Sequence, residues 1–478
     1  MNNSDYIQAF YTQISETPVD TPAFMLYDGD EISTISFGSF KKAVEQAAGY
    51  FIERGISRQH IGLAAPNSYD WIVTFYGILL SGNIAIPLNQ DLPVHMLLAQ
   101  CDQADITILC GTDASLEPVL QENTNFTLLT FQQVASQGIT AENAKYSVQP
   151  DDTILMIFTS GTTGKSKIVE YSSSALYYCL QEKNMLSDLN QSRLAIFPFY
   201  HMAGIFEVMI FLGCGRLTKL GRGMKYIFQD MRILEPHCIQ MPPTVLESLV
   251  KFLRNTKSIE EQQKITGKNL CEMNVVSSNA KIDLYHFMLE RGISMQTGYG
   301  MTESAGSGTQ CIVNERSIGS IGQHRGRTEL CIKDGELLMR GPSIMKGYYK
   351  DPEETAKVLK DGWLYTGDLA RRDEDDFYYI IGRKKNVIIL SNGENVNPEE
   401  IEDTLSACPH ILECMVYGDS KGICADIFTK DESLTKAFVK AYNESVPTYR
   451  QVYKINCQSE PLEKTGAGKI KRKENAYV

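Results

Sequence analysis

Glycines, hydroxyl-bearing residues and lysines are concentrated in one short segment, Thr159-Ser160-Gly161-Thr162-Thr163-Gly164-Lys165-Ser166-Lys167. The segment follows an apolar run at residues 155–158 that has the character of a buried strand. Glycines let the backbone approach a ligand closely, and amides and hydroxyls can donate hydrogen bonds to phosphate oxygens. The lysines can neutralise phosphate charge. The segment therefore predicts a phosphate-binding loop, with a solvated surface turn as the alternative.

Two other nucleotide-binding patterns do not fit the sequence. A Walker A loop, G-x-x-x-x-G-K-[ST], requires a glycine where this chain has Thr159. The later segment at residues 296–303 lacks the glycines of a G-x-G-x-x-G dinucleotide fingerprint. The P-loop and dinucleotide-binding classes are therefore disfavoured.

An aspartate and an arginine further along the chain could bind a sugar. Asp368 ends the run Tyr365-Thr366-Gly367-Asp368, and Arg383 follows fifteen residues later. A carboxylate can accept hydrogen bonds from both ribose hydroxyls, and an arginine can donate to sugar or phosphate. An isolated aspartate in such a turn is more often a satisfied loop residue. The ribose interpretation therefore depends on the other motifs in the chain.

The C-terminal region carries a basic segment around Thr465-Gly466-Ala467-Gly468-Lys469. From Lys464 to Lys473 there are five basic residues and no acidic one. A lysine ammonium can stabilise negative charge on phosphoryl oxygens, and Lys469 is a candidate for such a contact, with a solvated basic tail as the alternative.

An aromatic segment, Phe197-Pro198-Phe199-Tyr200-His201-Met202-Ala203-Gly204, could form the wall of an apolar pocket. His201 lies within it as the titratable group. A single histidine on an apolar stretch is often a hydrogen-bonded core residue, so that alternative stays open.

In their order along the chain, these motifs resemble the acyl-adenylate-forming superfamily, which includes acyl-CoA synthetases, adenylation domains of peptide synthetases and luciferases. The resemblance covers about residues 64–473, nearly the whole chain. It implies that Tyr299 stacks on adenine, Thr302 contacts the α-phosphate and Glu303 holds magnesium. One carboxylate is chemically sufficient, because Mg²⁺ beside a nucleotide takes phosphate oxygens as further ligands. The alternative for Glu303 is a surface carboxylate.

The resemblance also implies roles for other residues of this sequence. Catalytic roles fall on Lys469, His201, Thr302 and Glu303. The acyl pocket is formed by Phe199, His201, Met202 and Gly298. The hinge is Lys385, and Gly393 lies on the thiol-acceptor side. The implied ATP site consists of Thr159, Ser160, Gly161, Thr162, Thr163, Gly164, Lys167, Ser278, Asn279, Ala280, Tyr299, Gly300, Thr302, Asp368, Arg383 and Lys469.

Two features bear on the substrate. His201 stands where acyl-CoA ligases of the family carry histidine, whereas amino-acid-activating domains place an aspartate in that segment, and this chain has none there. Ser278 and Asn279 occupy a stretch where relatives have smaller residues. Larger side chains there predict a narrower pocket, and hence small or medium acids.

Composition limits the class of protein. The chain has 478 residues, with 58 acidic and 46 basic side chains and a formal net charge of -12. Nucleic-acid binding rests on clustered cations, so nucleic acid is not an expected partner. The twelve cysteines include no C-x-x-C pair, and the start MNNSDYIQAF lacks a signal-peptide pattern, which predicts a cytoplasmic protein with reduced thiols.

Apolar periodicity predicts an α/β fold. A helical pattern at residues 40–54 alternates with short apolar strands at 61–65, 106–110, 155–158, 194–197 and 238–241. Residues 71–88 are long enough to span a membrane, but their polar residues and Pro87 favour a buried helix that leads into a buried strand. We expect a large domain of doubly wound sheets.

A mainly antiparallel, barrel-like part is expected from about residue 327. Asp334-Gly335 predicts a tight hairpin, and a second hairpin-like pair is expected at 377–381 and 387–390. Asn397-Pro398 predicts the start of a helix that extends to about Leu405. The expected domains are residues 1–383, which bind ATP and acid, and residues 384–478, a small mobile α+β lid.

The sequence therefore predicts an enzyme that converts ATP and a small carboxylic acid to acyl-AMP and pyrophosphate, and then transfers the acyl group to a thiol. ATP, Mg²⁺ and coenzyme A as acceptor are the expected cofactors. A stand-alone adenylation enzyme that loads a carrier-protein pantetheine or an amine is the alternative. A catalytically silent nucleotide-binding protein on the same fold is a third reading.

Overall fold

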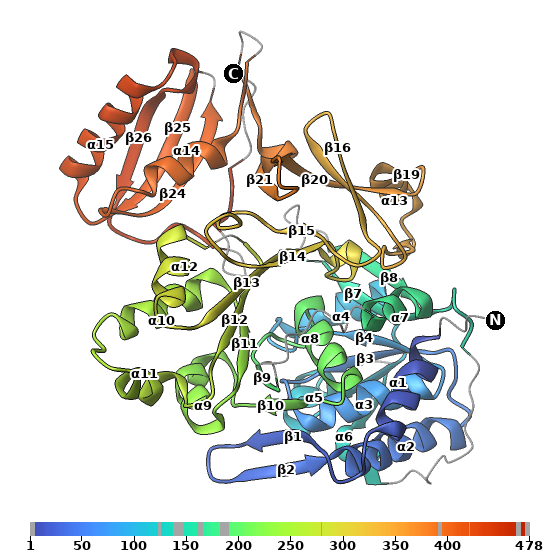
Figure 1. Cartoon of the computed structure of the whole chain (residues 1–478). Helices are drawn as coiled ribbons and strands as arrows, with labels where there is room; N and C mark the ends of the chain where they lie inside the picture. The colour runs from blue at the N-terminus through green and yellow to red at the C-terminus, as the bar shows by residue number, and fades with distance from the viewer. Residues whose placement is uncertain are drawn as a thin grey trace. The chain divides into compact units, whose positions relative to one another are not determined.

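The structure of the chain is a computed structural model that describes residues 5–122, 126–136, 148–159, 166–181, 191–278, 280–390, 394–419, 421–464 and 470–473. These residues form two compact units (Figure 1). The first unit comprises the described residues of Met1–Thr159, Ser166–Glu329 and Met339–Leu364. The second comprises those of Leu330–Leu338 and Tyr365–Val478. The expected boundary after residue 383 stays a prediction.

The first unit contains a nine-stranded sheet in the order β15-β14-β13-β12-β11-β9-β10-β1-β2. Six neighbouring strands, from β13 to β1, are parallel, and the strands beyond them at each edge are antiparallel. The strands are β1 (Pro22–Tyr27), β2 (Ile32–Ser36), β9 (Ser192–Ala195), β10 (Leu217–Leu220), β11 (Cys238–Met241), β12 (Glu272–Val275), β13 (Ser294–Tyr299), β14 (Thr309–Ile312) and β15 (Gln323–His324).

A seven-stranded sheet also belongs to the first unit, in the order β18-β8-β7-β4-β3-β5-β6. Its strands β7 to β6 are parallel, whereas β8 and β18 are antiparallel. The strands are β3 (His60–Ala64), β4 (Ile84–Pro87), β5 (Ile108–Gly111), β6 (Thr127–Thr130), β7 (Thr153–Phe158), β8 (Ile168–Ser172) and β18 (Gly347–Tyr348).

Helices connect these strands and bury them, as parallel sheets require. Every residue of β11 is buried, and an apolar core joins it to α9, α10 and α12. The helices of this unit are α1 (Tyr6–Glu16), α2 (Phe37–Glu53), α3 (Tyr69–Leu80), α4 (Val94–Gln103), α5 (Asp113–Leu120), α6 (Phe131–Ser136), α7 (Ser173–Gln181), α8 (Met202–Gly213), α9 (Ile227–Leu234), α10 (Pro243–Leu253), α11 (Ile259–Thr266), α12 (Ile282–Leu289) and α13 (Pro352–Val358).

The long apolar stretch at residues 71–88 forms a helix followed by a strand, as predicted. The Ser68 side chain caps α3 by accepting a hydrogen bond from the Trp71 amide at 3.1 Å, and most of the helix is buried. After a turn at Gly82, which has φ of 76°, the chain enters β4. Within the described residues, no helix is long and apolar enough to cross a membrane.

The antiparallel part forms a sheet in the order β16-β17-β20-β19, with β21 also paired to β20. Its first hairpin is confirmed, because Asp334 and Gly335 both have positive φ, 53° and 78°, as a type I′ turn requires. The strands are β16 (Glu329–Lys333), β17 (Glu336–Arg340), β19 (Leu359–Lys360), β20 (Trp363–Arg372) and β21 (Tyr378–Arg383).

The second expected hairpin is wrong. β21 pairs with β20, whereas β22 (Ile388–Ile389) pairs with β23 (Asn395–Val396). A short 3-10 helix, Lys384–Asn386, separates the two segments. Each segment therefore finds its partner elsewhere in the chain.

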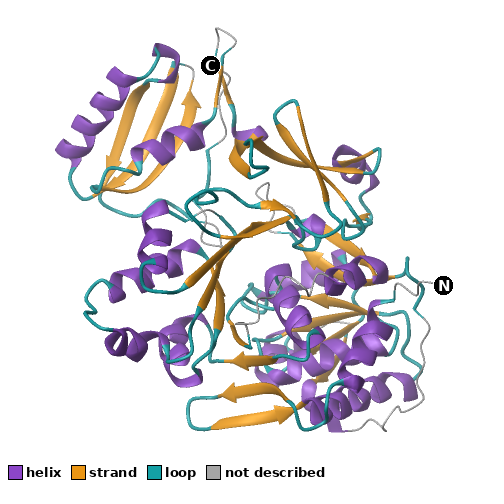
Figure 2. Cartoon of the chain, viewed as in Figure 1, coloured by secondary structure: helices purple, strands orange, loops and turns teal. Residues whose placement is uncertain are grey.

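The second unit ends in a small α+β arrangement. Its sheet has the order β24-β25-β26 and consists of β24 (Ile411–Asp419), β25 (Gly422–Thr429) and β26 (Val452–Gln458). Helix α14 (Pro398–Leu405) begins where the sequence predicts, with proline at its first position, and α15 (Glu432–Ser445) follows β25. Figure 2 shows both helices beside the three strands. Ile401, Leu405 and Val439 form part of their shared core.

Candidate active site

The order in which strands are added to the nine-stranded sheet reverses at β9. From β9 the chain first adds β10 on one side and later adds β11 on the other (Figure 1). In parallel sheets, ligands bind beyond the carboxyl ends of the strands at such a switch point. The segment after β9 contains Phe199 and His201. The neighbouring strands β12 and β13 end before Ser278 and at Tyr299, so three of the predicted site segments leave the same edge of one sheet.

The seven-stranded sheet has its own switch point at β3, which lies between β4 and β5. Asn67, just beyond β3, donates a hydrogen bond from Nδ2 to the Phe197 carbonyl at 2.7 Å. Its Oδ1 accepts a hydrogen bond from the Phe199 amide at 2.8 Å. One side chain thus joins the loops at the two switch points. Asn67, three residues after the end of β3, was not expected from the sequence.

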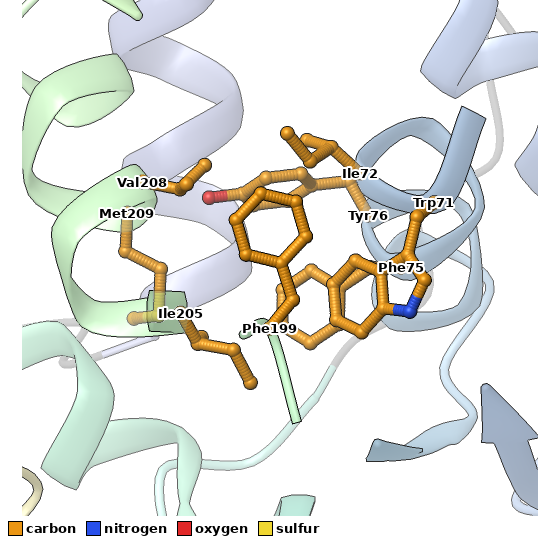
Figure 3. Close-up of a pocket in the computed structure, with 8 residues that line it drawn as sticks. All are labelled: Trp71, Ile72, Phe75, Tyr76, Phe199, Ile205, Val208 and Met209. Atoms are coloured by element: carbon orange, nitrogen blue, oxygen red, sulfur yellow. The ribbon is translucent and has the colours of Figure 1, made fainter. Parts of the chain in front are cut away.

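Phe199 lies in an apolar wall between two helices (Figure 3). Its ring is 2% exposed and lies 5.2 Å from the ring of Trp71. The residues around the small cavity beside it are Trp71, Ile72, Phe75 and Tyr76 of α3, Phe199, and Ile205, Val208 and Met209 of α8. The wall is therefore tightly packed. Of the other residues expected in the acyl pocket, Met202 is buried and Gly298 is half-buried.

His201 directly precedes helix α8 and is half-buried. Its ring centre is 4.5 Å from that of Tyr200. A Cβ at Gly204 would lie 2.4 Å from the Pro198 carbonyl oxygen, so the first turn of α8 presses against the preceding loop. Burial lowers the pKa of His201, so the imidazole is neutral at pH 7 and can both donate and accept a hydrogen bond.

The loop after β13 folds back on itself. A Cβ at Gly300 would lie 2.2 Å from the Gly306 carbonyl oxygen, so this close approach requires glycine. The Gly306 amide donates to the Met301 carbonyl at 3.1 Å, around the short 3-10 helix Thr302–Ser304. The fold-back places Thr302 and Glu303 at the turn of the loop.

Residues of the seven-stranded sheet and its surroundings hold this loop in place. The hydroxyl of Tyr348, in β18, donates to Glu303 Oε1 at 2.7 Å, and the Met345 amide donates to the Glu303 carbonyl at 2.9 Å. The buried Tyr171 hydroxyl donates to the Thr302 carbonyl. A half-buried carboxylate with one oxygen engaged in this way suits Mg²⁺, which takes few carboxylates and otherwise phosphate oxygens and water. Tyr171 and Tyr348 were not expected from sequence.

The base of the predicted phosphate loop is an antiparallel closure between β7 and β8. The Thr159 amide donates to the Lys167 carbonyl at 2.8 Å. Lys167 Nζ lies 2.5 Å from Glu354 Oε2 and, with Lys357, lowers the pKa of Glu354 to about 2. The ammonium of Lys167 is thus ion-paired here, and its contact with phosphate stays a prediction. Outside the described residues lie Ser160, Gly161, Thr162, Thr163 and Gly164.

In the second unit, Asp368 and Arg383 face each other across β20 and β21. Arg383 Nε lies 2.5 Å from Asp368 Oδ1, and the aspartate is only 2% exposed. The Thr366 hydroxyl accepts from the Asp368 amide at 3.1 Å, and Gly367 takes φ of 74°. The structure therefore brings together the two residues predicted to bind ribose.

Of the remaining predicted site residues, the structure describes some and not others. Ser278 is exposed and Ala280 is buried. Lys385 is exposed, within the short 3-10 helix after β21. Asn279, Gly393 and Lys469 lie outside the described residues. Their roles stay predictions.

Ion pairs hold the segments on either side of Lys469 against other residues of the second unit. Lys464 Nζ lies 2.6 Å from Glu413 Oε1, and Arg472 Nη2 lies 2.7 Å from Glu402 Oε2. Burial raises the pKa of Glu402, and Arg472 opposes that shift. The basic tail is thus anchored before and after the predicted catalytic lysine.

Comparisons with known proteins agree with this arrangement. Residues 10–349 match the AMP-binding enzyme family, and residues 385–477 match the AMP-binding enzyme C-terminal domain. The chain is 26% identical over 471 residues to 2-succinylbenzoate–CoA ligase of Bacillus mycoides, covering 93% of this chain and 94% of that protein. It is 26% identical over 538 residues to long-chain-fatty-acid–CoA ligase of Escherichia coli O157:H7, covering 95% and 91%.

Solved structures show the same fold. O-succinylbenzoate coenzyme A synthetase (MenE) from Bacillus subtilis in complex with AMP superposes with a TM-score of 0.82 at 21% identity, covering 97% of each chain. ATP-bound MatB from Rhodopseudomonas palustris gives 0.83 at 20% identity, covering 98% of this chain and 97% of that one. The expected fold class is therefore confirmed. The family match spans well over half of the sequence and agrees with the motifs, so this chain belongs to the AMP-binding enzyme family.

Proposed function

We propose that this protein is an ATP-dependent acid–CoA ligase. It joins a carboxylic acid to the α-phosphate of ATP, releases pyrophosphate, and then transfers the acyl group to coenzyme A. The observation that carries the proposal is the site at the carboxyl edge of the nine-stranded sheet. There, the Glu303 loop follows β13 and the Phe199–His201 segment follows β9, two parallel strands of one sheet, in an AMP-binding enzyme whose relatives include acid–CoA ligases.

In the first half-reaction, a carboxylate oxygen forms a bond to the α-phosphorus while the bond from that phosphorus to the bridging oxygen breaks. Tyr299 stacks on adenine, Thr302 donates to the α-phosphate and Asp368 accepts from the ribose hydroxyls. Glu303 holds Mg²⁺, which supplies charge neutralisation at the phosphates when bound. Lys469 stabilises the charge that develops on the phosphoryl oxygens.

In the second half-reaction, the sulfur of coenzyme A forms a bond to the acyl carbon, and AMP leaves with the oxygen that came from the acid. The thiol proton is released. Neutral His201, at the start of α8, can donate a hydrogen bond that orients the acyl carbonyl oxygen. The two half-reactions use different nucleophiles in one active site. Two arrangements of catalytic groups are therefore needed, and a hinged lid provides them.

The lid is residues 384–478, and residues 1–383 bind ATP and acid. Lys385 is the hinge. Lys469 serves the first arrangement, and Gly393 flanks the thiol in the second. The exposed position of Lys385 in a short 3-10 helix between β21 and β22 supports a hinge there, because a brief connector can absorb a change in backbone angles.

The substrate is a small or medium carboxylic acid. The tightly packed wall around Phe199 and the larger residues at Ser278 and Asn279 both favour a limited pocket. The protein works in the cytoplasm: all twelve cysteines are thiols, and seven are buried, which fits a reducing compartment.

Pyrophosphate release over a panel of aliphatic, aryl and dicarboxylic acids, with and without coenzyme A, tests the proposal. We expect release with at least one acid of small or medium size, and faster turnover when coenzyme A is present. Turnover that responds to a carrier-protein pantetheine or an amine, but not to coenzyme A, would favour the alternative acceptor. No release with any acid would overturn the proposal.

A further inference from the structure

Tyr348 links two parts of the candidate active site that are far apart in sequence. Its hydroxyl donates to Glu303 Oε1 at 2.7 Å, and its ring lies under Lys167 Nζ, 4.6 Å from the ring centre. We propose that Tyr348 is a positioning residue that holds the Glu303 carboxylate in the orientation needed to bind the divalent cation of the metal–nucleotide complex. The inference rests on the proposed role of Glu303 as metal ligand.

The hydrogen bond to Glu303 engages one carboxylate oxygen. Among the described residues, Tyr348 is the side-chain donor to this carboxylate. The Met345 amide, three residues earlier in the chain, donates to the Glu303 carbonyl at 2.9 Å. Backbone and side chain of Glu303 are therefore both held by one short segment. Within the described part of the chain, no hydrogen bond reaches the second carboxylate oxygen, which is left for a cation. Partners of this kind orient metal-binding groups and tune their affinity.

Tyr348 is itself rigidly placed. It is 6% exposed, and its backbone pairs with Val169 of β8. Its amide donates to Thr355 Oγ1 at 2.8 Å, within α13. Because strand pairing and the helix both fix the backbone, the tyrosine ring has little freedom to follow Glu303. The position of Tyr348 therefore sets the orientation of the Glu303 carboxylate.

The ring of Tyr348 also touches the base of the phosphate loop. Lys167, whose backbone carbonyl closes that loop at Thr159, places its ammonium over the ring and 2.5 Å from Glu354 Oε2. A cation over an aromatic face is attracted by the negative charge of the π system. Tyr348 therefore contacts both the Glu303 carboxylate, which is the proposed metal ligand, and Lys167 at the base of the phosphate loop.

The Tyr348 hydroxyl is the donor in its hydrogen bond with Glu303. Burial, followed by the negative charge of Glu303, raises the pKa of its hydroxyl. A tyrosine with a raised pKa keeps its proton at neutral and moderately alkaline pH.

The test uses Tyr348→Phe, which removes the hydroxyl but keeps the ring under Lys167. Tyr349→Phe is the matched control, because Tyr349 is the next residue and its hydroxyl donates at 2.5 Å to Asp105, an exposed carboxylate outside the predicted site. Mn²⁺ binding is measured by electron paramagnetic resonance in the presence of α,β-methylene ATP, which does not release pyrophosphate. This measurement reports the metal site without requiring turnover.

We expect Tyr348→Phe to weaken Mn²⁺ binding about 10- to 100-fold, the usual effect of removing a partner of a metal ligand. Binding of the nucleotide analogue without metal, and the unfolding temperature of the Tyr349→Phe control, should stay unchanged. Tyr348→Phe added to Glu303→Gln should have little further effect, since the hydroxyl acts through that carboxylate.

Equal Mn²⁺ binding by Tyr348→Phe and the wild-type protein would overturn the inference while leaving the proposed function intact. An equal loss in Tyr349→Phe would also overturn it, because the effect would then be a general one. A wild-type protein that binds no Mn²⁺ with the nucleotide, and releases no pyrophosphate, would overturn the proposed function together with the inference.

Discussion

The two sides of the candidate active site are built in different ways. On the phosphate side, hydroxyls from the seven-stranded sheet reach across to the Glu303 loop, and a lysine ion pair lies against the same tyrosine ring. On the acyl side, aromatic rings and aliphatic side chains pack closely around Phe199, and the Asn67 amide binds backbone atoms of the Phe197–Phe199 segment.

From this difference we expect the phosphate side to govern catalysis and the acyl side to govern substrate selectivity. Charge-assisted hydrogen bonds on a half-buried loop can be removed with limited harm to the fold, so substitutions on the phosphate side should change catalysis more than stability. Close-packed apolar walls respond to changes in volume, so substitutions on the acyl side should alter stability and substrate choice together. The predictions below test that separation.

The largest effect is expected at Lys469. Lys469→Ala should slow adenylation by about 10²–10³-fold, the range for loss of one transition-state donor. Thioester formation from preformed acyl-AMP should change much less, because that lysine serves only the first arrangement. Single-turnover assays of each half-reaction measure both rates. Equal losses in the two half-reactions would contradict a lid with two arrangements.

Glu303→Gln should raise the Mg²⁺ concentration needed for half-maximal pyrophosphate release by about 10- to 100-fold, because the shape is kept and the charge is lost. The free energy of unfolding should stay close to that of the wild-type protein. Glu329→Gln is a suitable control, since this exposed carboxylate pairs with Arg340 in the same unit. An unchanged magnesium titration in Glu303→Gln would remove this residue from the metal site.

Asn67→Ala should act on stability and selectivity together. It leaves the Phe197 carbonyl and the Phe199 amide without their partner and should lower the free energy of unfolding by about 1–3 kcal/mol. The ratio of kcat/KM values for two acids of different size should change as well, because the Phe199 segment loses its support.

Asn443→Ala is the matched control for Asn67→Ala. Asn443 binds the backbone of Val452 through both amide atoms, at 2.8 and 2.9 Å, in the second unit. It should lose stability to a similar extent with no change in the selectivity ratio. A selectivity change of equal size in both variants would show that Asn67 has no special relation to the acyl side.

Asn279→Gly should widen the pocket if this residue lies beside the acid. We expect kcat/KM for a bulkier acid to improve relative to the native one by about tenfold, in the range for one or two methylene-sized groups in an apolar pocket. Competition between two acids in one reaction measures the ratio directly. A ratio identical to that of the wild-type protein would place Asn279 away from the acyl side.

The smallest expected effect concerns His201 and pH. Burial lowers the pKa of the folded imidazole, whereas the unfolded residue titrates near about 6.5. Below that pH the unfolded state binds the extra proton first, so His201 should reduce stability as pH falls, by at most about 1.4 kcal/mol per pH unit. His201→Gln should show a weaker loss in urea unfolding between pH 7.5 and 5.5. A steeper loss in the variant would contradict this direction.

The sequence predicted features whose signal is local. The Asp334-Gly335 hairpin and helix α14 after Asn397 depend on residues a few positions apart. Asn67 and Tyr348 were missed because their partners lie 130 and 45 residues away, and no short pattern records such a contact. The prediction of the second hairpin was wrong because a short apolar segment can pair with several strands equally well. Its partner is determined by the rest of the sheet.

The central claim is that the acid is activated on the α-phosphorus of ATP, and an oxygen label tests it most directly. The protein is given a carboxylic acid labelled with ¹⁸O in both carboxylate oxygens, together with ATP, magnesium and coenzyme A, and the products are analysed by mass spectrometry. The account predicts one ¹⁸O atom in AMP and none in pyrophosphate. Label in pyrophosphate or inorganic phosphate, with unlabelled AMP or ADP as the nucleotide product, would contradict it.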